Sequence, residues 1–598
     1  MKIKLSDYVA QFIANQGVKH VFMVPGGGAM HLNDSIGHNN SIEFICNHHE
    51  QASAMAAETY ARIANNLGVA SVTTGPGGTN AVTGVAGAWL DSTPCLFISG
   101  QVKRSDLIGN LGVRQNGVQE VDIVSIVKPI TKYAVIIMDP NSIRYHMEKA
   151  VYLAKSGRPG PVWIDIPLDV QASIIEDAQL EAFSRESPDI LFNNITDLVA
   201  RTISLLNISE RPILFIGNGV RLSGAITDTI ELIDKIKIPV LLTWPALDML
   251  PETHELLVGR PGPVAPRGAN FALQNSDLLI SIGARLDTVV TGYAQDKFAR
   301  AAKKVMVDID QTELNKMQMK IDVSVCADAK LFIREIFKQI SSITPKNRLH
   351  WLSRCKDWKT KYPVVLPEYY KEKLVSTYVF TDVLSNELTS EDIIIPCSSG
   401  AGIETFLLAF KAKKGQRVVN TTALGAMGNG LPACIGGCLA SGRKRTISVD
   451  GDGGIQFNIQ EFDTMSRLNL PIKLFVLNNQ GYSSIRTSQT RYFKRLTGAD
   501  CTSGLSLPNI INIAKAYGLS TARISNQENL NKIIREVINT PGTVICEVCV
   551  PPDEPRAPSM MSMQKPDGSM ISKPLEDLWP FLERKEFLSN MIIPPLDE

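Results

Sequence analysis

The segment 445–479 has the residue types and spacing most suggestive of chemistry. It reads RTISVDGDGGIQFNIQEFDTMSRLNLPIKLFVLNN, which is typical of a strand, a glycine-rich turn, an amphipathic helix and a second strand. Such a crossover brings two parallel strand ends to one sheet edge, so Asp452 and Asn479 should meet. Their oxygens suit a hard divalent cation that also binds a diphosphate. Three glycines let the backbone approach those phosphates: Gly451, Gly453 and Gly454.

Short apolar runs rich in β-branched residues must position these groups. GVASVTT, PILFIG and RTISVD are examples, and helix-like segments separate them. This alternation is typical of α/β domains with parallel sheets covered on both faces. Because the chain is too long for one core, we predict three doubly wound parallel-sheet domains at 1–180, 190–345 and 375–550. The tail 551–598, rich in proline, methionine and serine, could form a lid.

The composition is that of a globular protein without a charged partner. Of the 598 residues, 44% are hydrophobic and 20% charged, and the net charge is +1, so nucleic acid and anionic membranes are not expected partners. The sequence contains no apolar stretch of about 20 residues and no signal-peptide pattern, which favours a cytoplasmic location. Cys546 and Cys549 form a C-x-x-C inside a strand-like run and are interpreted as buried strand residues.

These motifs and their order resemble the thiamine-diphosphate enzymes, and within them the acetolactate synthase-like group. The resemblance covers all three domains. It implies Mg²⁺ held by Asp452, Asn479 and the carbonyl of Gly481. Glu50, in CNHHEQASAM, looks like the family's cofactor-activating glutamate, a carboxylic acid that protonates the aminopyrimidine. In this family the first domain faces the third domain of a partner, which implies a homodimer or homotetramer with its active site at the subunit interface.

Other segments resemble the family's cofactor loops. VPGGGAM, TTGPGGTN and ALGAMGNGLP are three of them, and a fourth reads GAGIET. The residues assigned to cofactor binding by this resemblance are Gly26, Gly28, Gly77, Asn80, Gly402, Gly425 and Met427. Gly27, Gln119 and His31 are assigned to the catalytic group, and His48 and His49 are further proton-transfer candidates. GAGIET departs from the family because Ile403 and Glu404 replace a glutamine and a histidine.

The middle domain resembles one that binds FAD. FIGNGVRLSGA, SIGARLDTVV and VMVDIDQTE occur in the group's order. Glycine turns at strand ends suit a dinucleotide, with Arg285 near a phosphate and Asp308 or Asp328 near the adenosine half. The sequence leaves open whether this flavin would transfer electrons.

Three positions depart from the family on the acceptor side. Val118 stands where the group has a phenylalanine that crowds the pocket. Val289 stands where an arginine pairs with the carboxylate of the second keto acid, and Ser488 where a tryptophan selects small keto acids. Four basic side chains lie nearby: Arg486, Arg491, Lys494 and Arg495. The alternative interpretation of these basic residues is a solvated helix face.

We therefore predict decarboxylation of pyruvate and transfer of the two-carbon unit to a ketone acceptor, with the keto group of a nucleotide-linked deoxysugar as the preferred acceptor. Three alternatives remain open. One is acetolactate synthase itself, acting on pyruvate and a 2-keto acid. A second is an FAD-dependent pyruvate oxidase. A third is a non-catalytic interaction subunit, against which the intact Glu50, Asp452 and Asn479 argue.

Overall fold

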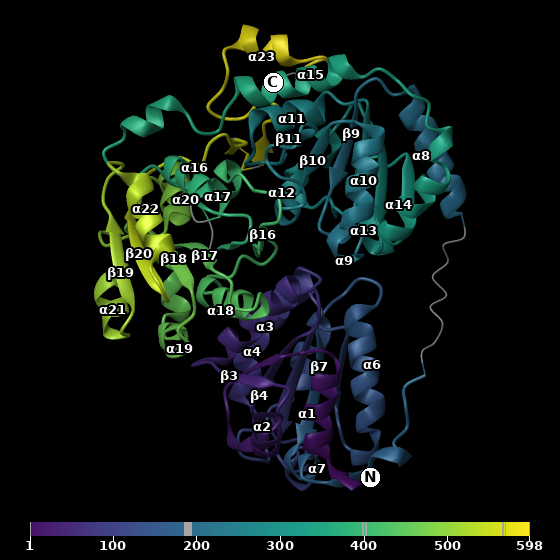
Figure 1. Cartoon of the computed structure of the whole chain (residues 1–598), viewed down its shortest axis with the longest axis vertical. Helices are drawn as coiled ribbons and strands as arrows, with labels where there is room; N and C mark the ends of the chain where they lie inside the picture. The colour runs from purple at the N-terminus through teal and green to yellow at the C-terminus, as the bar shows by residue number, and fades with distance from the viewer. Residues whose placement is uncertain are drawn as a thin grey trace.

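The protein contains three parallel six-stranded sheets covered by helices, as predicted (Figure 1). The computed structural model describes residues 2–184, 194–397, 400, 403–564, 567–568 and 570–596. Within these residues, no helix combines the length and apolar character needed to cross a membrane.

The strands β4, β5 and β7 of the first sheet are buried along their whole length, which explains their near-continuous apolar sequences. Its strand order is β3-β2-β4-β5-β7-β6, all parallel. The strands are β2 (His20–Met23), β3 (Glu43–Cys46), β4 (Gly68–Val72), β5 (Cys95–Gln101), β6 (Tyr133–Ile136) and β7 (Val162–Pro167). The main helices are α1 (Leu5–Asn15), α2 (Met30–Gly37), α3 (Glu50–Ala64), α4 (Pro76–Leu90) and α6 (Ile143–Lys155).

The second sheet has the order β11-β10-β9-β12-β13-β14, again all parallel. Its strands are β9 (Pro212–Ile216), β10 (Val240–Leu242), β11 (Leu257–Gly259), β12 (Leu278–Ile282), β13 (Lys303–Asp308) and β14 (Val323–Cys326). The helices around it are α8 (Ile195–Ile208), α9 (Gly219–Leu222), α10 (Ile226–Ile236), α11 (Arg267–Gln274), α12 (Thr288–Thr291), α13 (Gln311–Asn315) and α14 (Ala329–Lys338).

The third sheet has the order β16-β15-β17-β18-β20-β19, with every pair parallel. Its strands are β15 (Ile393–Pro396), β16 (Arg417–Val418), β17 (Thr446–Gly451), β18 (Ile472–Asn478), β19 (Ser520–Ile524) and β20 (Val544–Cys549). Its helices are α16 (Thr377–Glu387), α17 (Glu404–Ala409), α18 (Gly430–Ala440), α19 (Glu461–Arg467), α20 (Ser483–Phe493), α21 (Ile510–Ala516) and α22 (Leu530–Asn539). Cys546 is buried within β20, as its apolar context indicates, whereas Cys549 at the end of the strand is only partly buried, contrary to the prediction.

Each sheet has a switch point, where the chain reverses its direction of progress across the strands. These points lie between β2 and β4, between β9 and β12, and between β15 and β17. The crevice at the carboxyl ends of such strands is where open α/β sheets bind ligands. The glycine-rich segments singled out in the sequence follow these strands, so all three ligand sites are set by topology.

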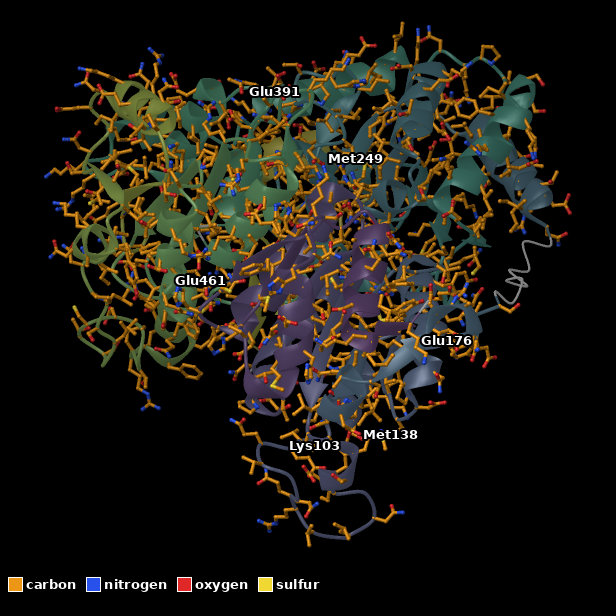
Figure 2. All side chains as sticks on the ribbon, turned by 60° about the horizontal axis from the view of Figure 1, so that its bottom comes forward. Lys103, Met138, Glu176, Met249, Glu391 and Glu461 are labelled. Atoms are coloured by element: carbon orange, nitrogen blue, oxygen red, sulfur yellow. The ribbon has the colours of Figure 1, made fainter. Side chains whose placement is uncertain are left out.

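The first and third sheets pack together through α3 and α18. A Cβ added at Gly436 of α18 would lie 2.1 Å from the carbonyl oxygen of Ala56 in α3, so only glycine permits this approach. Glu461, labelled in Figure 2, accepts a 2.8 Å hydrogen bond from Asn47 across the same boundary. The two sheets therefore share one continuous apolar core.

The C-terminal tail packs against the middle domain. Glu576 lies fully buried, 2.6 Å from both Arg300 and Gln274, and α23 (Arg584–Asn590) lies beside α15 (Figure 1). The region between the second and third sheets contains α15 (Leu349–Lys361), which buries Trp351 and Trp358. The segment left between the second and third predicted domains is thus partly a packed helix.

Candidate active site

Three oxygens converge where β17 and β18 end. The amide oxygen of Asn479 lies 3.1 Å from Asp452 Oδ1 and 2.5 Å from the carbonyl oxygen of Gly481. Exchanging the amide oxygen and nitrogen would turn these contacts into hydrogen bonds. A carboxylate, an amide and a carbonyl are, however, the oxygen ligands that a hard divalent cation takes. The donor set therefore fits Mg²⁺ in the present amide orientation.

Neighbouring backbone and side-chain groups hold this cluster in place. The Arg486 guanidinium donates to the carbonyl oxygens of Asn479 and Gln480, at 3.3 and 3.1 Å. It also lies 3.4 Å from Asp500. Arg486 is 7% exposed, so it braces the loop after β18 rather than contributing to a basic rim. This differs from the sequence-based interpretation, because the loop carbonyls provide enough acceptors to bury a guanidinium.

Burial gives Asp452 its electrostatic character. Desolvation raises the pKa of Asp452 to about 6, although its carboxylate accepts hydrogen bonds from the amides of Gly453 and Gly481, at 2.8 and 3.2 Å. A buried carboxylate of this kind is stabilised in its charged form by a cation. Gly451 and Gly425 lie beside open space, because a Cβ at either would meet no atom within 4 Å. That space suits a diphosphate close to the backbone.

Glu50 begins α3 at the carboxyl edge of the first sheet. It is 8% exposed, and its Oε2 accepts a 2.9 Å hydrogen bond from Asn80. The preceding His49 caps the helix, since its Nδ1 accepts from the amide of Gln51 at 3.1 Å. A buried carboxylate with one neutral donor is suited to holding and releasing a proton.

The two glycine loops beside Glu50 approach each other more closely than side chains would allow. A Cβ at Gly26 would lie 2.5 Å from Thr73, and one at Gly28 would lie 1.8 Å from the hydroxyl oxygen of Thr74. At Gly77 it would lie 3.6 Å from Glu50. Gly27 faces open space. The predicted residues Gly26, Gly28, Gly77, Asn80 and Glu50 are therefore brought together at one edge.

Two of the predicted histidines have structural contacts. His48 Nε2 lies 2.9 Å from Asp463 Oδ2 of the third domain, and His49 serves as the helix cap. His31 lies on α2, where burial lowers its pKa.

Val118 and Gln119 lie in an exposed loop. This loop follows Lys103 and extends away from the three sheets (Figure 2). Val118 is 85% exposed, and Gln119 has a positive φ of 62°. An apolar side chain this exposed beside a candidate site is available to a second subunit.

A cavity of about 570 Å³ opens between the second and third sheets and the tail. Predicted residues that line it are Val289, Ile403, Glu404, Gly425 and Ser488. Within the described part of the chain, no residue before Trp244 lines it. Glu50 and the first-domain glycines are thus not in contact with this cavity in a single chain. Met427 is half-buried beside Gly425, and Gly402 lies outside the described residues.

Sequence reasoning suggested the tail as a lid over the site but missed the contacts that its individual residues make. Arg556 pairs with Glu404, and Met560 lines the cavity with its amide donating to Pro263 at 2.6 Å. Trp244 and Tyr293 were also missed. Arg556, the first residue of RAPSMMS, gave no spacing signal, because its partner Glu404 lies 152 positions earlier in the sequence.

A second cavity, of about 400 Å³, lies at the switch point of the middle sheet. Arg285, Asp308 and Asp328 line it, with Asp91 and Arg158 from the first domain. A Cβ at Gly217 would lie 2.1 Å from the carbonyl oxygen of Gly283, so these turns meet only as glycines. The set of glycine turns and polar groups fits a dinucleotide such as FAD.

The polar groups of this cavity are held from both sides. The Arg285 guanidinium donates to the carbonyl oxygen of Leu90 at 2.9 Å and to Asp287 at 3.0 Å. Burial raises the pKa of Asp308, whereas Asp328 caps α14 by accepting from the amide of Lys330 at 2.8 Å. Trp244, Val289 and Thr422 line both this cavity and the larger one, so they form a shared wall.

Family models match the chain in three consecutive parts. The N-terminal TPP binding domain of thiamine pyrophosphate enzymes matches residues 3–126. The central domain of the same enzymes matches residues 199–336, and their C-terminal TPP binding domain matches residues 401–548. These ranges contain Glu50, the flavin-type cavity turns and the Asp452 cluster respectively.

Relatives are similar over nearly the whole chain. Acetolactate synthase 1, chloroplastic, of Nicotiana tabacum is 32% identical over 574 residues, which cover 94% of this chain and 83% of the relative. The acetolactate synthase large subunit of Cyanidium caldarium is 33% identical over 568 residues, covering 93% and 94%. Acetolactate synthase, chloroplastic, of Arabidopsis thaliana is 33% identical over 574 residues, covering 94% and 83%.

Proposed function

Because the chain belongs to the thiamine pyrophosphate enzymes, and within them to the acetolactate synthase family, we propose that it decarboxylates pyruvate and transfers the two-carbon unit to a second 2-keto acid. The observation that carries this proposal is the convergence of the oxygens of Asp452, Asn479 and Gly481 at adjacent strand ends. The family's cofactors are thiamine diphosphate and Mg²⁺, with FAD.

Thiamine diphosphate, when bound, supplies a carbon nucleophile and an electron sink for decarboxylation. Asp452, Asn479 and the Gly481 carbonyl would hold Mg²⁺ against its diphosphate. Glu50 would hold a proton at the aminopyrimidine, with Asn80 fixing the carboxylate at 2.9 Å. Gly425, Met427 and Gly402 would lie along the cofactor. The tail segment 553–562, part of which lines the cavity, would exclude water as a lid.

The complete site requires two subunits in this proposal. Glu50 and the glycine loops of the first domain would face the oxygen cluster of a partner, in a homodimer or homotetramer. The separation of Glu50 from the described lining of the 570 Å³ cavity supports this arrangement. The exposed loop with Val118 and Gln119 would then reach the partner's cavity.

A second candidate differs only in the acceptor. Val289 lines the cavity, is 38% exposed and provides no charge for an acceptor carboxylate. Ser488 is small, and the cavity measures about 570 Å³. These observations favour a ketone larger than a 2-keto acid, such as a nucleotide-linked keto-deoxysugar. In that case the donor reaction would be unchanged.

The test is product analysis with labelled pyruvate, Mg²⁺ and thiamine diphosphate. Acceptors are 2-ketobutyrate, cyclic ketones and nucleotide-linked 4-keto sugars, and products are identified by mass spectrometry. Acetolactate or acetohydroxybutyrate as the main product would establish the synthase. Label mainly on a ketone or sugar would establish the second candidate.

Two controls separate the remaining alternatives. Anaerobic bleaching of the flavin by pyruvate would identify an oxidase, and recovery of the labelled pyruvate unchanged would reject both carboligase proposals. The Asp452→Ala variant should abolish every labelled product, because it removes the charged ligand of the cation.

A further inference from the structure

The charged side chains around the 570 Å³ cavity differ in whether they have an ion-pair partner. Arg556 is paired with Glu404, and Asp553 lies 3.8 Å from the buried Arg486. Among the described residues that line the cavity, Arg491 is the one cationic side chain without an ion-pair partner. Arg491 is exposed, so its guanidinium is available to a ligand that enters from solvent.

The helix geometry directs Arg491 toward the same space as the acceptor positions. Thr487, Ser488 and Arg491 all line the cavity from α20, and spacings of three and four residues place side chains on one helix face. Helix α20 begins at Ser483, two residues after Gly481 of the oxygen cluster. At a rise of 1.5 Å per residue, Arg491 lies about 12 Å along the helix from that end.

The opposite wall has no charge to offer. Val289 faces the cavity from α12, where its own amide donates to Asp287 at 3.1 Å. Arg285, four residues earlier, is engaged with Asp287 and Leu90 on the side of the smaller cavity. An anionic acceptor therefore finds its available cation on α20 rather than on the middle domain.

We propose that Arg491 binds the anionic group of the acceptor and so determines acceptor specificity, an inference that rests on the proposed carboligase function. A planar guanidinium matches both carboxylate and phosphate, with two parallel hydrogen bonds. The shared chemistry is an oxyanion. A 2-keto acid would present it as a carboxylate, and a nucleotide-linked sugar as a phosphate.

The test compares acceptors that differ in charge. Arg491→Gln, Arg491→Lys and the wild type are assayed with 2-ketobutyrate, with butanone, which lacks the carboxylate, and with a nucleotide-linked 4-keto sugar. Arg491→Gln should raise KM for the anionic acceptor by about ten- to a hundredfold, because a charge-assisted hydrogen bond is lost. The kcat and the KM for butanone should stay within about twofold, and Arg491→Lys should restore part of the affinity.

Lys494→Gln is the matched control, since Lys494 directly follows α20 but does not line the cavity. A rise in KM for 2-ketobutyrate alone identifies carboxylate recognition, and a rise for the sugar alone identifies phosphate recognition. Equal changes for butanone and the anionic acceptors, or the same effect from Lys494→Gln, would overturn the proposal.

Two further measurements separate this inference from the proposed function. The first-turnover burst of carbon dioxide from pyruvate reports the donor reaction before an acceptor binds, and Arg491→Gln should leave the size of this burst unchanged. Calorimetric titration of each anionic acceptor into wild type and Arg491→Gln measures binding without turnover. Unchanged affinity in the variant would reject the role of Arg491 even if the donor reaction is active, and weakened affinity would support it even if no product forms.

Discussion

Glu50 is a carboxylate whose function depends on two features of one helix end. It is nearly buried, and it has one side-chain donor, Asn80. The first turn of α3 would stabilise a negative charge there, since unpaired amides point out of the helix start. The helix start therefore presents a buried carboxylate, with one oxygen fixed by Asn80, to a ligand that binds beside it.

Replacing Glu50 by Gln removes proton transfer while preserving shape. We expect product formation to fall by about 10²- to 10⁴-fold, the contribution typical of a positioned acid or base. Thiamine diphosphate binding, measured by fluorescence titration, should persist because the Asp452 cluster is intact. Asn80→Ala should reduce activity less. Near-normal activity of Glu50→Gln would refute the assigned role.

The sequence allowed some site residues to be predicted and concealed others. Asp452 and Asn479 were predictable because each directly follows a strand of one crossover, which leaves little freedom in where they lie. Arg486 was not, because its burial depends on the carbonyls of Asn479, Gln480 and Pro552 in a loop without regular pattern. Spacing finds residues fixed by strand ends, but not those fixed by irregular backbone.

At the scale of elements, β5 and β7 share a buried acid. Asp165 on β7 accepts hydrogen bonds from Ser99 at 2.5 Å and from Gln101 at 3.0 Å. Gln101 also donates at 3.0 Å to the carbonyl of Val121, next to the loop of Gln119. Burial raises the pKa of Asp165 to about 7. Below about pH 7 the strand pair thus carries a proton that an unfolded chain would already have released.

This proton makes stability depend on pH. Between about pH 4, where the unfolded aspartate loses its proton, and about pH 7, the folded state binds one proton more, so the contribution of Asp165 to stability falls as pH rises. Asp165→Asn does not titrate. The free energy of unfolding of Asp165→Asn, relative to that of the wild type, should therefore rise as the pH increases from about 4 to about 7, by at most about 4 kcal/mol.

Urea unfolding of both proteins at pH 5.0 and pH 7.5 measures the effect. A difference between the two proteins that stays constant with pH would show that Asp165 is ionised in the fold.

The elements themselves were predictable to different degrees. Strands such as β4, β9 and β17 were evident because burial on both faces selects uninterrupted β-branched runs. Helix α15 was obscured, since its lysines and arginines mask the buried Trp351 and Trp358. The packing of Glu576 against Arg300 joins positions 276 residues apart, a distance that local pattern does not report.

At the scale of the whole molecule, the proposed arrangement gives each chain two half-sites. One contains Glu50 with its glycine loops, and the other contains the oxygen cluster and the 570 Å³ cavity. If the active site forms between two subunits, a chain that is inactive because one half-site is mutated still supplies its intact half-site to a partner. A mixture of two different inactive variants is therefore informative.

We expect Glu50→Gln and Asp452→Ala chains, each inactive alone, to recover activity when dissociated and reassociated together. In a statistical mixture of dimers, half are mixed and each mixed dimer has one intact site, so about one quarter of wild-type activity should return. Activity is followed as acetolactate formation. Absence of recovery, with mixed dimers verified by mass spectrometry, would place the whole site within one chain.

The wall of Trp244, Val289 and Thr422 separates two chambers by single side chains. Because only these side chains stand between the two cavities, a charge bound in the 570 Å³ cavity would act on a group bound in the 400 Å³ cavity. A flavin seated there would be close enough for its absorption and fluorescence to register a charge arriving beyond Val289. The absorption and fluorescence of the flavin would then report whether an acceptor is bound, even if the flavin takes no part in electron transfer.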